Sequence, residues 1–307
     1  MQFTCGGEYP MPEILALPFP GGYLYINPRA PTTTSSFSDR EPRADSREPP
    51  TEQQTPPPQK PMHTPTVSHS HWLRFQRECE RLGLSFVRAG NLATCGLAPD
   101  DNTTHAIVVA QTGGAYWHRL ERARQVDAAL DRAEHPLDTM TRRMAGRLRR
   151  LLGEACDSVH FPFDEHPVDF VSVARALGMG QPSRLRILIH PRFGLWFAFR
   201  MLFRVRDVEG VLPPSPALEE HPCTSCDAPC IRACPAGAIH GPAGEEQLDY
   251  PASFRYRISH PDVCRDACAA RLACPVGTEF RYSDAFLAHS HRRAFAVGRR
   301  YFEAQDE

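Results

Sequence analysis

Seven of the 11 cysteines in this 307-residue chain lie between Cys223 and Cys274. The other four, Cys5, Cys79, Cys95 and Cys156, are scattered. Thiolates bind zinc ions and iron–sulfur clusters. The N-terminus has no secretion signal, and in a chain without one, clustered cysteines favour metal binding over disulfides. We therefore expect a metal centre in this part of the chain.

The spacing of the clustered cysteines favours iron. The run "HPCTSCDAPCIRACP" (221–235) reads C-x₂-C-x₃-C-x₃-C-P. The bacterial ferredoxin run is C-x₂-C-x₂-C-x₃-C-P, and its fourth cysteine binds the other cluster in two-cluster proteins. A second run ends in Cys274-Pro275, and "CPAGA" and "CPVGT" carry a glycine at the same offset. This repeat of the Cys-Pro motif indicates a duplicated ferredoxin half. When the two copies are aligned on it, the third ligand position of the second copy falls near Ala270, which has no sulfur.

Two unequal sites follow from this alignment. One set has four thiolates and is expected to hold a [4Fe-4S] cluster: Cys223, Cys226, Cys230 and Cys274. The other set has only three: Cys234, Cys264 and Cys268. It is expected to hold a three-iron or labile cluster, a four-iron cluster with an outside fourth ligand, or nothing. A zinc knuckle is the alternative for the whole module, but zinc prefers two separated C-x₂₋₄-C pairs, often with histidine.

A second distinctive segment, "ILIHPRFGLWFAFRMLFRVRDVEGVLPP", spans residues 187–214. Strand alternation places two sets of side chains on opposite faces: Leu195, Phe197, Phe199 and Met201 on one, and Trp196, Ala198, Arg200 and Leu202 on the other. Arg200 is thus expected among apolar residues. It either extends to solvent at a sheet edge or points into a ligand cavity and binds an anion.

This segment resembles the cobalamin-processing family of methylmalonic aciduria and homocystinuria type C. The resemblance lies in the motif I-H-P-R-F-G-x-W-F-A-x-R and in the motif V-x-x-L-P-P that follows it. The resemblance covers about residues 82–214 and is weaker upstream. It implies a nitroreductase-like sandwich that binds cobalamin with its lower base displaced and removes the upper cobalt ligand. By the same resemblance, Arg200 and Trp196 line the upper-ligand side, and the surrounding motif contains His190, Arg192 and Gly194. The stretch between "FPFDEHP" and "ILIHP" is shorter than in the family's animal form.

A cobalamin-type domain followed by a ferredoxin module also looks like epoxyqueuosine reductases and reductive dehalogenases, whose clusters feed single electrons to cobalt. Our first hypothesis is accordingly a cobalamin-binding oxidoreductase that reduces cobalt or removes its upper ligand, with an epoxyqueuosine reductase-like enzyme as a variant. The second is a non-catalytic corrinoid carrier with a structural or redox-sensing cluster. The third is a flavin-dependent reductase on the same sandwich. The expected electron donor is a low-potential partner such as a flavodoxin or ferredoxin reductase.

Periodicity indicates the elements that hold these residues. Helical patterns cover 71–84, 113–130, 137–155, 168–179 and 282–300, and strand patterns cover 105–111, 158–163, 185–190 and 195–205. Their alternation predicts an α/β or α+β layered fold. The expected domains are a largely disordered proline-rich arm (1–68), the α/β domain (69–212), a linker (213–220), a ferredoxin-like module (221–285) and a C-terminal helix and tail (286–307).

The charge of the chain bears on whether it binds nucleic acid or a membrane. The formal net charge is −1, so no global field draws the chain to nucleic acid or membrane. One expected helix carries a basic face: Arg142, Arg143, Arg147, Arg149 and Arg150. Such a run is either a solvated face or a stripe that contacts RNA phosphates, and the near-zero net charge favours the first. No window approaches the roughly 18 apolar residues of a membrane span, and no targeting pattern is present, so we expect a cytoplasmic protein.

Overall fold

The computed structural model describes residues 16–19, 22–25, 66–98, 103–165, 167–208, 220–241 and 248–303. Most of the expected arm and nearly all of the expected linker lie outside the described residues. In the part of the chain that is described, no helix is long and apolar enough to cross a membrane.

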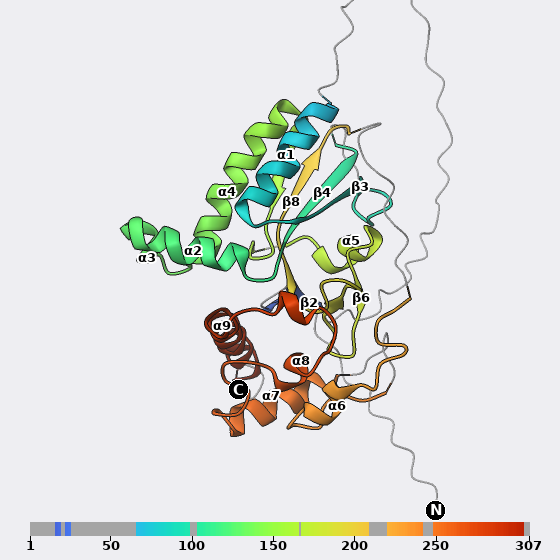
Figure 1. Cartoon of the computed structure of the whole chain (residues 1–307), viewed down its shortest axis with the longest axis vertical. Helices are drawn as coiled ribbons and strands as arrows, with labels where there is room; N and C mark the ends of the chain where they lie inside the picture. Colours follow the sequence, from blue (N-terminus) through green and yellow to red (C-terminus); the bar gives the residue numbers. More distant parts are fainter. Residues whose placement is uncertain are drawn as a thin grey trace, which may run out of the picture.

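A four-stranded antiparallel sheet forms the centre of the larger domain (Figure 1). Its strand order is β3-β4-β8-β5. The bounds are β3 Phe86–Asn91, β4 His105–Thr112, β5 Cys156–His160 and β8 Phe197–Val205. All residues of β4 except His105 are buried, because elements cover both faces of the sheet. The fold is therefore mixed α+β, and the parallel α/β alternative is wrong for this sheet.

Helices cover the two faces unequally (Figure 1). One face carries α1 His69–Leu82, α2 Ala115–Val126, α3 Ala128–Asp131 and α4 Pro136–Leu152, and the other carries α5 Phe170–Ala176. The single helix predicted over 113–130 is wrong. The chain breaks at Asp127, whose carboxylate accepts hydrogen bonds from the amides of Ala129 and Leu130 and so caps α3.

A β-bulge in β8 changes the direction of its side chains. Met201 pairs with Val109, but the next pair is Phe199 with Ala110, so Arg200 has no direct partner. Phe199 then packs into the core beside α5, whereas Met201 packs into the core beneath α1 and α4. The prediction that Phe199 and Met201 share one face is therefore wrong. The bulge is the physical reason, because an extra residue shifts the alternation by one position.

The cysteine-rich part gathers at one end of the sheet domain (Figure 1). It contains α6 Pro229–Ala233, α7 Tyr250–Ser259, α8 Ala269–Leu272, the 3₁₀ turn Thr278–Phe280 and α9 Asp284–Glu303. The remaining short elements are β1 Ala16–Phe19, β2 Gly22–Tyr25, β6 Gln181–Pro182, β7 Leu188–Ile189 and the 3₁₀ turn Gly153–Ala155. A small core joins Cys223 and Cys274 to Ile189 and Leu195 of the larger domain. The two parts therefore pack directly on each other.

Candidate metal centre

The four cysteines of the expected complete site lie together. Cys223 and Cys274 are each 8% exposed and share one apolar core, and Cys230 packs against it. Burial raises the pKa of Cys274, and its neighbours Cys223, Cys226 and Cys230 add to that rise. The fold thus brings Cys274 to the distant first run, as the duplicated pattern predicts.

The loop that carries Cys223 is tied to the α+β domain. His221 uses both ring nitrogens: Nδ1 accepts from the Cys223 amide at 3.1 Å, and Nε2 donates to the Pro182 carbonyl at 2.9 Å. Arg184 Nη1 donates to the Cys223 carbonyl at 3.1 Å. These bonds fix the loop without using a thiol, so the sulfur remains available for a metal.

The three cysteines of the expected incomplete site also lie together. Cys234, Cys264 and Cys268 line one cavity of about 80 Å³. Ala270, at the position where the repeat lacks a sulfur, lines the same cavity. Cys264 has a left-handed backbone (φ 56°), which is uncommon for a residue other than glycine. A strained residue at a cavity is consistent with a functional constraint.

Two buried arginines give the second cavity its charge. Arg257 and Arg271 line it and are 8% and 7% exposed. Burial lowers the pKa of Arg257, and Tyr250, Cys268 and Cys264 oppose that shift. The acidic groups that face these cations are therefore phenols and thiols. A buried cation is costly unless an anion pairs with it, so an anionic cluster held by the thiolates fits this cavity.

Within the described ranges, no group of three or more His, Cys, Asp or Glu side chains is arranged to hold a single metal ion. A zinc ion requires all its ligands around one atom. An iron–sulfur cluster spreads its thiolates over separate iron atoms, so its ligands stand farther apart.

The glycine of the I-H-P-R-F-G motif contacts the cysteine module. Gly194 has φ 55°, and a Cβ there would lie 2.0 Å from the Val276 carbonyl oxygen. A Cβ on Gly277 would lie 2.4 Å from the carbonyl carbon of Phe193. The two backbones touch where only glycine fits. The motif therefore docks onto the loop that follows Cys274.

The other motif residues shape this turn. His190 Nδ1 accepts from the amides of Arg192 and Phe193 at 3.1 and 3.3 Å, and its ring stacks on Phe193. Burial lowers the pKa of His190 to about 4, and the nearby arginines Arg88 and Arg192 add to the decrease. His190 is thus a neutral turn residue with one ring nitrogen occupied. Arg192 is exposed and lies over the Phe193 ring.

Trp196 and Arg200 point inward from the sheet. Trp196 is fully buried, with Arg271 4.8 Å from its ring centre and the Tyr282 ring edge-on at 5.7 Å. Arg200 Nε donates to Gln111 Oε1 at 2.8 Å. The sheet-edge alternative for Arg200 is wrong, because β8 is an inner strand and the bulge turns the side chain toward Gln111 and Tyr116. Trp196 is thus covered, and the half-buried Arg200 bonds Gln111 through Nε, so their role toward a corrinoid stays a prediction.

A larger, open cavity of about 530 Å³ lies between the start of α4, the segment after β5 and α9. Arg293 of α9 donates to Asp138 Oδ2 at 2.7 Å in its wall. Asp138 also acts electrostatically to raise the pKa of Arg200, and Arg293 acts to lower it. The polar wall of the cavity can accept a ligand that carries amides or charges.

Most arginines of the basic α4 face already have partners. Arg142 pairs with Asp164 at 3.1 Å, Arg143 with Asp127 at 2.5 Å and Arg147 with Glu78 at 2.5 Å. These contacts occupy the groups that would bind phosphate. The choice between a solvated face and an RNA-contacting stripe stays a prediction.

Sequence patterns do not identify three residues of the second cavity: Arg257, Arg271 and His291. They come from α7, α8 and α9; Arg257 and His291 lie outside the two cysteine runs, and Arg271 lies between Cys268 and Cys274 but is not part of a metal-ligand motif. Arg271 also donates to the Leu195 carbonyl at 2.5 Å and thereby connects the cavity to the α+β domain.

No protein-family model and no curated protein matches this chain. Similar solved structures include epoxyqueuosine reductase with an epoxyqueuosine-modified tRNA-Tyr stem loop, at 13% identity and TM-score 0.47 over 74% of this chain and 70% of that chain. The Bacillus subtilis epoxyqueuosine reductase is 12% identical, with TM-score 0.45 over 70% of this chain and 68% of that one. The C. elegans B12-trafficking protein CblC is 14% identical, with TM-score 0.43 over 75% and 96%. These low values describe a likeness of fold and carry no conclusion about chemistry.

Proposed function

We propose that this chain is an iron–sulfur oxidoreductase whose cysteine module relays single electrons to an acceptor on the α+β domain. The observation that carries the proposal is the convergence of Cys274 with Cys223, Cys226 and Cys230 beside the interlocked Gly194 and Gly277. When bound, a [4Fe-4S] cluster supplies one-electron transfer. The interlock holds that site against the sheet domain.

The protein's own groups support this role. Burial raises the pKa values of Cys223, Cys230 and Cys274, so these thiols are protonated without metal and release protons when iron binds. Arg271 interacts electrostatically with Cys268 and Cys274, one from each set. A fixed positive charge between the two sites favours the more negative, reduced state of a cluster in either one.

We further propose that the acceptor is a corrinoid, the class implied by the sequence resemblance. Tyr282 and Arg271 cover Trp196, so both side chains would have to move before the indole could contact such a ligand. The open cavity lined by Arg293 has a volume of about 530 Å³. Cofactor sites typically measure about 300–1,000 Å³, so this cavity could hold part of a corrinoid. An RNA substrate has less support, because the arginines of α4 are paired.

An anaerobic reduction assay tests the proposal. Dithionite-reduced protein is mixed with cyanocobalamin, and the cobalt absorption is followed with time. We expect the wild type and the packing control Cys95→Ala to reduce the corrinoid, and the double variant Cys223→Ser, Cys226→Ser to fail. Equal rates in the double variant contradict the relay. In parallel, the protein is titrated separately with flavin and with cobalamin, and a spectral shift with flavin alone identifies a flavin acceptor. To test the donor class, reduced flavodoxin then replaces dithionite as the reductant.

A further inference from the structure

We propose that His291 is the fourth ligand of the second site, so that Cys234, Cys264, Cys268 and His291 together hold a [4Fe-4S] cluster. This inference rests on the iron–sulfur function proposed above. It identifies the donor that replaces the sulfur missing at Ala270.

The cavity itself supplies the first argument. His291 lies on α9 and lines the same cavity as the three cysteines. Among the residues that line this cavity, only the three cysteines and His291 carry thiolate or imidazole groups, which are ordinary ligands of iron. Ala270 is 1% exposed and contributes only a methyl group. A cluster in this cavity therefore meets three sulfurs and one imidazole.

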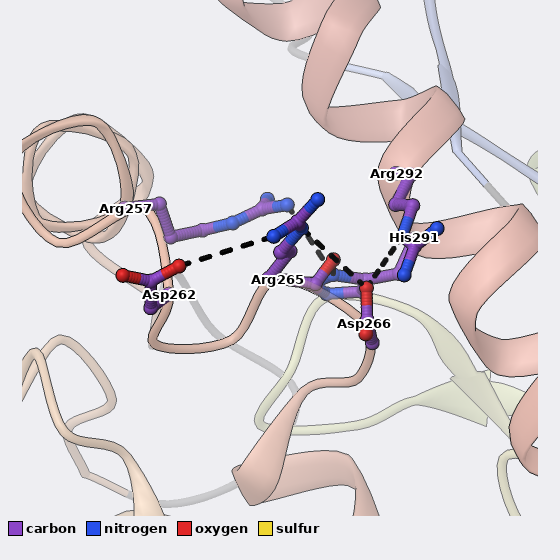
Figure 2. A network of polar contacts seen from close by, with 6 residues as sticks. All are labelled: Arg257, Asp262, Arg265, Asp266, His291 and Arg292. Atoms are coloured by element: carbon purple, nitrogen blue, oxygen red, sulfur yellow. Dashed lines mark hydrogen bonds and ion pairs between the residues drawn. The ribbon is translucent and has the colours of Figure 1, made fainter.

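The second argument is the way in which α9 is attached to the cysteine loop (Figure 2). Asp266, inside the loop between Cys264 and Cys268, pairs with Arg292 at 2.5 Å. The neighbouring residue Arg265 places its carbonyl oxygen 3.4 Å from His291 Nδ1. Two adjacent residues of α9 thus hold two adjacent residues of the loop, and His291 is fixed beside the loop that carries Cys264 and Cys268.

The orientation of the ring is that of a metal ligand. Histidine ligands usually donate their second ring N–H to a carboxylate or a backbone carbonyl. Nδ1 of His291 lies 3.4 Å from the Arg265 carbonyl oxygen, to which it donates in one tautomer, and 3.4 Å from Arg257 Nη2, from which it accepts in the other. Among the described residues, no hydrogen bond occupies Nε2 of this ring. The proposal requires the first tautomer, in which Nδ1–H donates to Arg265 and the Nε2 lone pair is left for iron.

Charge makes this ligand set different from the first. A neutral imidazole in place of a thiolate makes the cluster one charge less negative, and histidine ligation raises the potential of iron–sulfur centres. Arg257 acts in the same direction, because it is a cation in the cavity wall and interacts electrostatically with Cys264 and Cys268. The second cluster is therefore easier to reduce than the first and receives electrons from it at equilibrium.

Pulsed EPR on full-length protein labelled with ¹⁵N-histidine tests the assignment. We expect nitrogen hyperfine coupling on the higher-potential reduced cluster of the wild type. His291→Ala abolishes the coupling and converts that site from four irons to three. His291→Cys also abolishes it but keeps a four-iron cluster, at a lower potential. His240→Ala, an exposed histidine of the same module, leaves the coupling unchanged.

Three results overturn the assignment. The first is coupling that survives in His291→Ala and in His291→Cys. The second is a wild-type second site with three irons, or with four irons and no coupled nitrogen, which leaves the relay function standing. The third is a protein that contains zinc and no sulfide, which overturns both proposals. The cysteine variant keeps the test valid if the alanine variant does not fold.

Discussion

Replacement of Gly194 by alanine tests whether the I-H-P-R-F-G motif anchors the cysteine module. The new Cβ would lie 2.0 Å from the Val276 carbonyl oxygen, against 3.4 Å for the short end of an ordinary contact. The backbone must therefore separate by about 1.4 Å, the difference of these two distances. Because Val276 follows Cys274 by two residues, this shift acts directly on a ligand of the first cluster.

The magnitude combines two costs. A left-handed backbone costs a residue with a Cβ about 1–2 kcal/mol relative to glycine. Overpacking of a tight contact adds about 1–3 kcal/mol. Gly96→Ala is the matched control, because Gly96 has φ 71° but no atom within 4 Å of its Cβ position. We expect Gly194→Ala to lose about 2–5 kcal/mol of stability and Gly96→Ala only about 1–2 kcal/mol.

Thermal unfolding of the anaerobic holoprotein and the rate of iron release to a chelator measure these effects. Gly194→Ala should unfold at a lower temperature than Gly96→Ala and release iron faster. Equal midpoints and equal release rates in the two variants would refute the idea that the motif and the module interlock.

Three further variants test separate parts of the structure. Arg271→Gln should lower the midpoint potential of at least one cluster by on the order of 60 mV, which corresponds to ~1.4 kcal/mol for one electron; a redox titration that shows no shift contradicts the placement of this cation. Arg200→Ala should cost about 1–3 kcal/mol in denaturant unfolding, because it leaves the buried Gln111 oxygen without its donor, whereas a surface control, Arg149→Ala, should cost little. The hydrogen bond from Arg81 lowers the pKa of Glu78 below its ordinary 4.5, so this carboxylate stabilises the fold above that pH and the contribution is lost as pH falls through the lowered pKa. Glu78→Gln should therefore cost up to about 1 kcal/mol near neutral pH and nothing in acid, and a cost that persists in acid contradicts the ion pair with its two arginines.

The sequence predicted the long, strongly periodic elements well. The helices α1, α4 and α9 and the strands β4 and β8 follow from periodicity because each buries one continuous apolar face or run. The grouping of the seven cysteines into two sets followed from the repeated Cys-Pro pairs. In both cases the signal lies in local spacing, which the chain carries directly.

Features that depend on tertiary contacts were not predictable. The bulge at Arg200 is set by the pairing of β8 with β4. Strand alternation alone therefore placed Phe199 and Met201 on the same face, which is wrong. The predicted strand over 185–190 shortens to Leu188–Ile189, because the flanking residues form turns. The packing of Gly194 and Trp196 against the cysteine module is a tertiary contact that the resemblance does not give, and their ligand role stays a prediction. His291 carries no spacing signal because it reaches the cavity from a separate helix.

The most direct measurement is the iron and sulfide content of anaerobically purified protein, with redox titration followed by EPR, for the wild type and for Cys274→Ser. An iron–sulfur relay predicts equal amounts of iron and sulfide, reducible one electron at a time, and loss of the lower-potential cluster in Cys274→Ser. Stoichiometric zinc without sulfide in the wild type, or an unchanged lower-potential cluster in the variant, would contradict it.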